Sequence, residues 1–151
     1  MDDFTQFTVK HDFLPQVIPV SRVWTDEPDK VTEVKNQGSC GSCWTFSAIG
    51  AVETRYAKIA GVLRNFAEQE YLDCVYEGQR NGCGGGWPGL AFAYSQSRGG
   101  RLAAQTDYPY SNRDGKCDEE KPDAMVAAKI VSQVTVESSE QKLVEALSSG
   151  T

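Results

Sequence analysis

The sequence has few of the features that mark membrane, nucleic-acid-binding or metal-binding proteins. No apolar run approaches the roughly 18 residues that a membrane-spanning helix requires. Its 15 lysines and arginines are outnumbered by 21 aspartates and glutamates, whereas nucleic-acid binders carry a basic face. The one histidine, His11, leaves the scattered cysteines without the close Cys/His pair that zinc needs. We therefore expect no membrane, nucleic acid, metal or cofactor among the partners of this chain.

Signals of secretion are also lacking. Residues 1–16 have acids near the start and no apolar signal-peptide core, and no Asn-x-Ser/Thr acceptor occurs anywhere. With 151 residues, 40% hydrophobic and 24% charged, the composition is that of one globular domain or a piece of a larger protein. If the protein is secreted, we expect its true start to be missing from this chain.

Hydrophobic periodicity predicts one long central helix over residues 43–60. Ser42 is a suitable N-cap, and Gly61 is a suitable residue to follow the last turn. Apolar side chains lie on most sides of this helix, which is typical of a buried helix with one end at the surface. The main apolar stripe is expected to comprise Trp44, Ala48, Val52 and Ile59, with Phe46, Ile49 and Tyr56 lying off it.

Three shorter helices and one strand are predicted around it. Helices are expected over residues 68–74, from Pro88 to just before Gly99, and from near Ser138, with Gln141 at the capping-box position. Loose alternation over residues 126–136 predicts a strand, while the stretch before it is typical of a loop. Since one strand cannot form a sheet, we expect its partners to be missing.

Cys43 differs from the other cysteines in its position. It opens the central helix, where unpaired N–H groups and the helix dipole favour an anion such as a thiolate. Glycines precede it and would let a substrate chain approach. The side-chain amide of Gln37 could donate to an oxyanion together with the Cys43 N–H. A redox dithiol or half of a zinc site, formed with Cys40, is the alternative interpretation of this C-x-x-C pair.

The number of cysteines does not reveal their redox state. All five could be reduced in a cytosolic protein, or two disulfides could leave one thiol free. The count alone leaves both states open. The five positions are 40, 43, 74, 83 and 117.

Several segments resemble the papain and cathepsin L family of cysteine proteases, whose signature is C-G-[SA]-C-[WY]. The longest is NQGSCGSCWTFSA at residues 36–48. Members of this family have an α+β fold of two domains, and they use a cysteine thiol together with a histidine. The resemblance runs, in the same order, from about Ile18 to the C-terminus through Val23-Trp24, EQEYLDC (68–74), NGCGGGWP (81–88), DYPY (107–110) and Cys117.

The chain departs from the family pattern at a few positions. Ala67 replaces the usual serine before Glu-Gln-Glu, which removes a natural N-cap unless Asn65 substitutes. Thr45 and Gly84 replace a common alanine and a common asparagine. Neither of these two changes touches the chemistry that the resemblance implies.

The resemblance implies the left, mainly helical domain of the papain fold, built around a central buried helix, with the β-rich right domain largely absent. Residues 18–151 would form this domain, and residues 1–17 would be the tail of a propeptide or a cloning remnant.

The resemblance also implies a pairing for every cysteine. Cys40 should pair with Cys83 and Cys74 with Cys117, which leaves Cys43 free. Disulfides of this kind imply an oxidising compartment, so that a lysosomal, vacuolar or secreted protein is expected.

By the same resemblance the activity is that of a thiol endopeptidase, made as a zymogen, that acts on peptides and proteins. Cys43 would be the nucleophile and Gln37 an oxyanion donor. Gly85 and Gly86 would pair with an extended substrate, and Trp87 and Pro88 would line the pocket for its side chain. Propeptides and cystatin-like inhibitors are the other expected partners.

The general base of this family is a histidine oriented by an asparagine, both from the second domain. By the resemblance, we expect that domain to lie beyond residue 151, and His11 precedes the part that resembles the mature enzyme. We therefore expect the chain alone to be inactive or weakly active. The alternative hypothesis is a non-catalytic papain-like protein with a binding or structural role.

Overall fold

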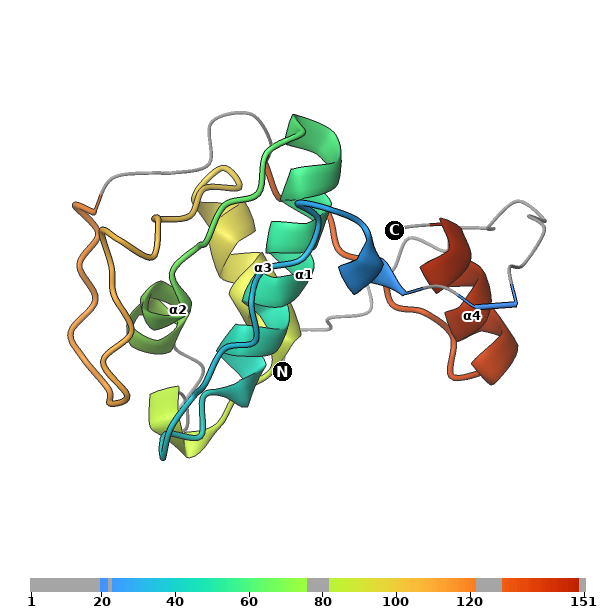
Figure 1. The fold of residues 1–151 in the computed structure, drawn as a ribbon. Helices are drawn as coiled ribbons and strands as arrows, with labels where there is room; N and C mark the ends of the chain where they lie inside the picture. Colours follow the sequence, from blue (N-terminus) through green and yellow to red (C-terminus); the bar gives the residue numbers. More distant parts are fainter. Residues whose placement is uncertain (1–19, 22, 76–81, 122–128, 150–151) are drawn as a thin grey trace.

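The computed structural model describes residues 20–21, 23–75, 82–121 and 129–149 (Figure 1). The tail predicted for residues 1–17, with His11, lies outside these residues, as does the start of the predicted strand. The elements in chain order are η2 (Trp24–Asp26), α1 (Cys43–Ala60), α2 (Glu68–Cys74), η3 (Gly82–Gly84), α3 (Pro88–Ser97) and α4 (Glu140–Ser149).

The central helix α1 packs against α2 and α3 (Figure 1). Its predicted bounds are confirmed, and Gly61 ends it in the left-handed region with φ of 70°. The predicted stripe is partly wrong, because Ile59 is 57% exposed, whereas Ile49 and Tyr56 are buried. Ile59 lies in the last turn, along an open apolar groove, so the core does not reach it. The buried residues of α1 are Trp44, Thr45, Ala48, Ile49, Val52, Glu53, Tyr56 and Ala57.

Aromatic side chains fill the core between these helices. Tyr56 and Phe66 are fully buried and meet edge to face, with their ring centroids 5.2 Å apart. Tyr71 of α2 meets Tyr94 of α3 in the same way at 6.2 Å. Such pairs add about 0.5–1.5 kcal/mol to the free energy gained from burial itself.

Buried charges join the segment before α1 to both α1 and α2. The ammonium of Lys35 lies 2.6 Å from Glu53 of α1 and 2.6 Å from Glu68 of α2, and both carboxylates are fully buried. Glu53 also accepts hydrogen bonds from Thr32 Oγ1 and from the backbone N–H of Phe66. The chain that leads into residues 37–42 is therefore fixed to two helices.

Two disulfides close loops over the same framework. Cys40 is bonded to Cys83, and Cys74 is bonded to Cys117, each across a separation of 43 residues. These are the pairings that the family resemblance implies. On the chain-entropy model, a loop of this length stabilises the folded state by about 4 kcal/mol.

The predicted strand is wrong for the residues that the structure describes. Residues 129–136 form no ladder, and their recorded backbone bond joins the Ile130 N–H to the Gly100 carbonyl at 3.4 Å. Alternating side chains favour a strand only where a neighbouring strand forms backbone hydrogen bonds with it. No such neighbouring strand is present among the described residues.

The start of α4 differs by one residue from the predicted start near Ser138. Ser139, not Ser138, caps α4, since its Oγ accepts from the Lys142 N–H at 3.2 Å. Lys142 thus takes the capping-box position, and the Gln141 side chain donates to Glu145 instead. Ala67 stands at the N-cap of α2 without a side-chain bond, as its replacement of serine predicts.

Candidate active site

Cys43 is the first residue of α1, and its free thiol is exposed. A helix of 18 residues ends there, so its aligned peptide dipoles favour negative charge at this point. Within the described part of the chain, the N–H groups of Cys43 and Trp44 make no hydrogen bond. The thiol thus lies beside two free backbone donors.

Ser42 stands at the N-cap but does not cap the helix with its side chain. It is fully buried, and its Oγ lies 2.6 Å from the hydroxyl of Tyr110. Its backbone carbonyl accepts the N–H groups of Thr45 and Phe46, which closes the first turn of α1.

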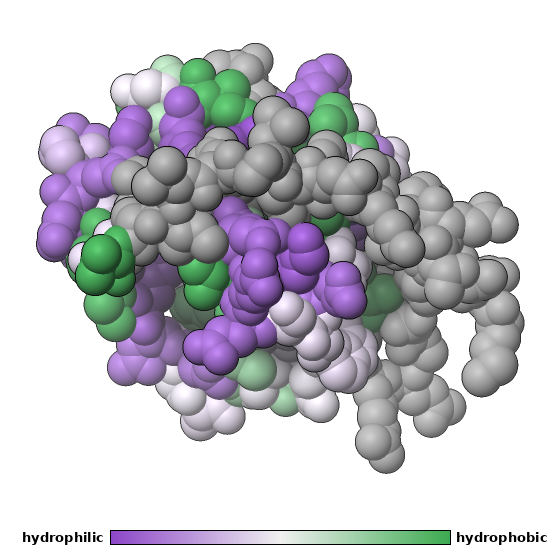
Figure 2. Space-filling view, turned by 90° about the vertical axis from the view of Figure 1, so that its right-hand side faces the viewer, coloured by the Kyte–Doolittle hydropathy of each residue, from purple (hydrophilic) through white to green (hydrophobic). Residues whose placement is uncertain are grey.

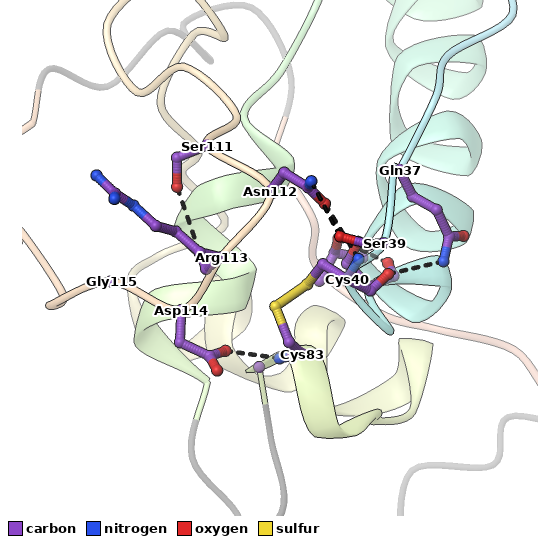
Figure 3. Close-up of a disulfide and its surroundings, with 12 residues drawn as sticks. Gln37, Ser39, Cys40, Cys83, Ser111, Asn112, Arg113, Asp114 and Gly115 are labelled. Carbon is purple, nitrogen blue, oxygen red and sulfur yellow. Dashed lines mark hydrogen bonds between the residues drawn. A yellow bond between two sulfur atoms is a disulfide. The ribbon is translucent and has the colours of Figure 1, made fainter.

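Gln37 lies at the other end of the loop that precedes Cys43. Its side-chain amide donates to the carbonyl of Cys40 at 2.9 Å (Figure 3). A primary amide has two N–H donors, so this bond leaves one for a further acceptor. The backbone carbonyl of Gln37 accepts from the Tyr110 hydroxyl at 2.7 Å.

The loop between Gln37 and Cys43 turns around Asn112 (Figure 3). The side-chain oxygen of Asn112 accepts the Cys40 N–H at 3.0 Å, and its amide donates to Ser39 Oγ at 3.3 Å. Gly38 has φ of 65°, and a Cβ there would lie 2.6 Å from Asn112 Oδ1. A side chain at position 38 would therefore be both strained and in collision with Asn112.

A second loop, residues 82–87, lies directly beside the first. The Gly41 N–H donates to the Cys83 carbonyl at 3.2 Å, and the Trp44 indole donates to the Gly82 carbonyl at 3.2 Å. The Cys83 N–H in turn donates to Asp114 at 2.6 Å (Figure 3). The Cys40–Cys83 disulfide joins the two loops covalently.

The residues predicted to bind substrate continue this second loop. Gly86 lies against the indole of Trp44, where a Cβ would come within 2.7 Å of ring atoms. Its N–H and carbonyl make no hydrogen bond among the described residues. Trp87 is 73% exposed, and Pro88 is the first residue of α3. Gly85, with φ of 101°, faces open space. The structure thus brings Cys43, Gln37 and this loop to one end of α1.

An apolar groove lies elsewhere on the molecule. It has a volume of about 560 Å³ between α1 and α4, and it contains none of the predicted site residues. Its apolar lining includes Ile59, Val131 and Leu143. Figure 2 views the side on which α4 lies, and its described surface is largely hydrophilic with apolar side chains in separate spots.

Three residues around the site were not predicted as such: Tyr110, Asn112 and Asp114. They reach loops that lie 31 to 73 residues earlier in the chain, so no local pattern indicates their contacts. The only available signal is the segment DYPY, which ends at Tyr110 and belongs to the family resemblance.

Neither a metal cluster nor a membrane-spanning helix is found within the described ranges. No three histidine, cysteine or acidic side chains there come together as metal ligands. None of the described helices has the length and apolar character required to cross a membrane.

Comparison with known proteins identifies the family. The sequence model of the papain family cysteine proteases matches residues 18–151. Pro-cathepsin H of Bos taurus is 42% identical over 129 residues, which cover 85% of this chain and 38% of that protein. Cysteine protease 1 of Oryza sativa subsp. japonica is 45% identical over 109 residues, or 72% of this chain and 22% of that protein.

Solved structures show the same likeness. The recombinant stem bromelain precursor superposes with a TM-score of 0.77 at 37% identity, over 87% of this chain and 41% of that one. Bromelain from Ananas comosus, in complex with the E64 inhibitor, superposes with a TM-score of 0.64 at 39% identity. The match covers 71% of this chain and 48% of that one. The predicted left, helical papain-like domain is confirmed, and this chain spans less than half the length of these relatives. The chain belongs to the papain family of cysteine proteases.

Proposed function

We propose that this chain supplies the nucleophile and one side of the substrate cleft of a thiol endopeptidase that hydrolyses peptide bonds. The observation that carries the proposal is the position of Cys43. It is the cysteine left free by two disulfides, and it is exposed at the N-terminus of a buried helix beside unpaired N–H donors. A buried structural cysteine would have none of these features.

The chemistry begins with attack of the Cys43 thiolate on the carbonyl carbon of the scissile peptide. The carbonyl oxygen then becomes an oxyanion, which accepts from the Cys43 N–H and from the second N–H of the Gln37 amide. Collapse of this intermediate expels the amine and leaves the acyl group on Cys43 as a thioester. Water then hydrolyses the thioester and releases the free thiol.

The loop of residues 85–88 would align the substrate for this attack. The unpaired N–H and carbonyl of Gly86 suit an extended peptide that pairs with the loop as a short added strand. Gly85 leaves its side open because it carries no Cβ. Trp87 and Pro88 offer an exposed apolar wall for the substrate residue two positions before the scissile bond.

The proton transfers need a general base that residues 12–151 do not contain, since the chain has one histidine, at position 11. We propose that the base comes from a segment outside this chain, and that the chain alone is inactive or weakly active. Removing one member of a catalytic triad leaves only a small residual activity.

The two disulfides support a lysosomal, vacuolar or secreted location for the working enzyme. Inhibition by a propeptide and by cystatin-like proteins that enter the cleft is part of the same proposal. One of the solved relatives is a precursor, and another is bound to an inhibitor.

The proposal is tested against the non-catalytic alternative by labelling the 151-residue chain with iodoacetamide or an epoxysuccinyl reagent. We expect a single adduct on Cys43, formed faster at pH 6 than on a cysteine in an unstructured peptide, and Cys43→Ser serves as the control. A labelling rate equal to that of the peptide would favour a binding or structural protein.

A chimaera tests the need for a base. In it, this chain replaces the 129 residues of bovine pro-cathepsin H that it matches, so that the rest of that protein is kept. We expect the activated chimaera to hydrolyse a peptide amide and the chain alone to show no useful turnover. Equal turnover by both proteins would contradict the proposal that the base lies outside the chain.

A further inference from the structure

We propose that Tyr110 is a positioning residue for the oxyanion site, an inference that rests on the proposed function. Its hydroxyl donates to the Gln37 carbonyl at 2.7 Å and lies 2.6 Å from Ser42 Oγ. A phenol has one proton, so the Ser42 hydroxyl is the donor to Tyr110. One side chain thus holds both ends of the loop whose flanks carry the two proposed oxyanion donors, Gln37 and Cys43.

The bond to Tyr110 also decides what Ser42 does at the helix start. A serine at the N-cap ordinarily turns its Oγ to the N–H of the second or third helical residue. Ser42 makes no such bond, because its buried hydroxyl is committed to Tyr110. The N–H of Trp44, the second helical residue, consequently stays without an acceptor among the described residues. Tyr110 therefore keeps the N-terminus of α1 available to a substrate oxygen.

Tyr110 is itself held in place by α1. Its ring meets Phe46, in the first turn of that helix, edge to face with centroids 4.9 Å apart. Asn112, two residues further on, binds the Cys40 N–H in the middle of the same loop. The loop is thus fixed at Gln37, Cys40 and Ser42 by one short segment of chain.

The segment of residues 108–115 is anchored in turn to α2. The side chain of Gln69 accepts the Ser111 N–H at 2.8 Å and donates to the Arg113 carbonyl at 2.9 Å. Asp73 accepts the Gly115 N–H at 2.7 Å, so the segment is held at residues 111, 113 and 115. The position of Tyr110 is therefore set by the core and does not depend on substrate.

Small displacements of the donors are expected to matter for catalysis. Donors act on an oxyanion at 2.7–3.1 Å, and a misplacement of about 1 Å can lower a rate by up to about 100-fold. Removing the Tyr110 hydroxyl would free the Gln37 carbonyl and let Ser42 turn back to cap α1. The first change loosens the Gln37 donor, and the second occupies the free N–H of Trp44 beside that of Cys43. Both changes weaken the oxyanion site and leave the thiol of Cys43 in place.

The test compares Tyr110→Phe with Tyr108→Phe in the chimaera described above. The two variants lose the same hydroxyl from the same segment, but Tyr108 binds Asp73 and does not contact the loop before Cys43. Two measurements are made on each variant: kcat and KM for a peptide amide, and the rate of Cys43 alkylation by iodoacetamide, which forms no oxyanion. A third variant, Tyr110→Phe with Ser42→Ala, cannot cap the helix by a serine.

We expect Tyr110→Phe to lower kcat about tenfold with KM and the alkylation rate within about twofold of the unaltered chimaera. Tyr108→Phe should leave all three within about twofold, and the double variant should regain part of the lost kcat. Equal kcat in the two single variants, or a parallel fall in alkylation, would overturn the positioning role. An inactive unaltered chimaera would instead refute the proposed function.

Discussion

The framework, which we define as residues 32–75 and 82–121 with α1, α2 and α3, differs sharply from the region of residues 129–149. In the framework, side chains such as Ile49, Phe66 and Leu102 are completely buried, and two disulfides and buried ion pairs join its parts. In the second region, Val131 is 82% exposed, and Leu143 and Leu147 of α4 are about half exposed. The proposed site lies entirely in the framework, whose core is filled from within and in which Glu68 Oε2 is a buried oxygen without a hydrogen-bond partner.

The difference indicates where stability and chemistry reside. A half-exposed leucine contributes little to folding, because burial of apolar area is the main favourable term. The apolar groove between α1 and α4 is thus a surface that remains partly unburied in this chain. Changes in the framework should act on the whole fold, whereas matched changes in residues 129–149 should act locally.

The largest effect is expected from the second disulfide. Replacing Cys74 and Cys117 by serine should lower the free energy of unfolding by about 4 kcal/mol, because the closed loop spans 43 residues. Urea denaturation of the 151-residue chain measures this loss. Amide hydrogen exchange should become faster in α1 and α2. Unchanged protection of these helices would contradict the view that the disulfide stabilises the whole framework.

A lysine that contacts two buried carboxylates in the framework is expected to matter more than a lysine in α4. Lys35→Met leaves Glu53 and Glu68 buried without their cation, which should cost about 3 kcal/mol. The matched change Lys142→Met removes the partly exposed pair with Glu145 and should cost clearly less, because water screens such a pair. Equal losses in urea denaturation would show that the two regions do not differ in this way.

Alkaline pH should weaken the framework before any other part. Burial, with the charge of Glu70, raises the pKa of Tyr94 to about 12, and burial raises the pKa of Tyr71 and Tyr108. These phenols ionise near pH 10 when unfolded, so the unfolded chain releases protons that the folded chain keeps. The stability that they contribute is fully present below about pH 10 and is lost as the pH rises towards 12.

Short thermal scans at pH 9 and pH 11 check this expectation. We expect the melting temperature to fall between these values, and to fall less in Tyr94→Phe, which has no phenol to ionise. In α4 the Lys142 ammonium lowers the pKa of Glu145, so its contribution is lost at acid pH instead. A melting temperature that stays constant up to pH 11 would contradict the role of the buried tyrosines.

The smallest effect is expected from the cap of α4. Ser139→Ala removes the acceptor of the Lys142 N–H and should lower the stability of this helix by about 1 kcal/mol. The expected readout is faster hydrogen exchange in α4 with unchanged exchange in α1. Ser138→Ala is the control, since Ser139 and not Ser138 makes the capping bond.

Local patterns were sufficient to predict the helices of the framework. Gly61 and Pro88 mark an end and a start that depend on backbone geometry alone, and the structure confirms both. The strand predicted over residues 126–136 is wrong for residues 129–136, which the structure describes, because a strand depends on a neighbour that no local pattern specifies. The prediction for Ile59 was wrong because periodicity indicates which face of a helix is apolar but not how far the neighbouring elements extend along that face.

The site was predictable only in part. Cys43 and Gln37 lie within one short motif, so their proximity follows from the sequence itself. The disulfide pairings came from the family resemblance, since five cysteines allow many arrangements. Tyr110 and Asn112 act across about 70 residues, and only the folded chain brings them to the loop before Cys43.

Peptide hydrolysis by the chimaera, compared with its Cys43→Ala variant, tests the central claim most directly. We predict turnover of a peptide amide by the unaltered chimaera, an acyl adduct on Cys43 detected by mass spectrometry after rapid acid quenching, and loss of both in the variant. Hydrolysis that persists without the Cys43 thiol, or a folded and processed chimaera that never forms the adduct, would contradict the account.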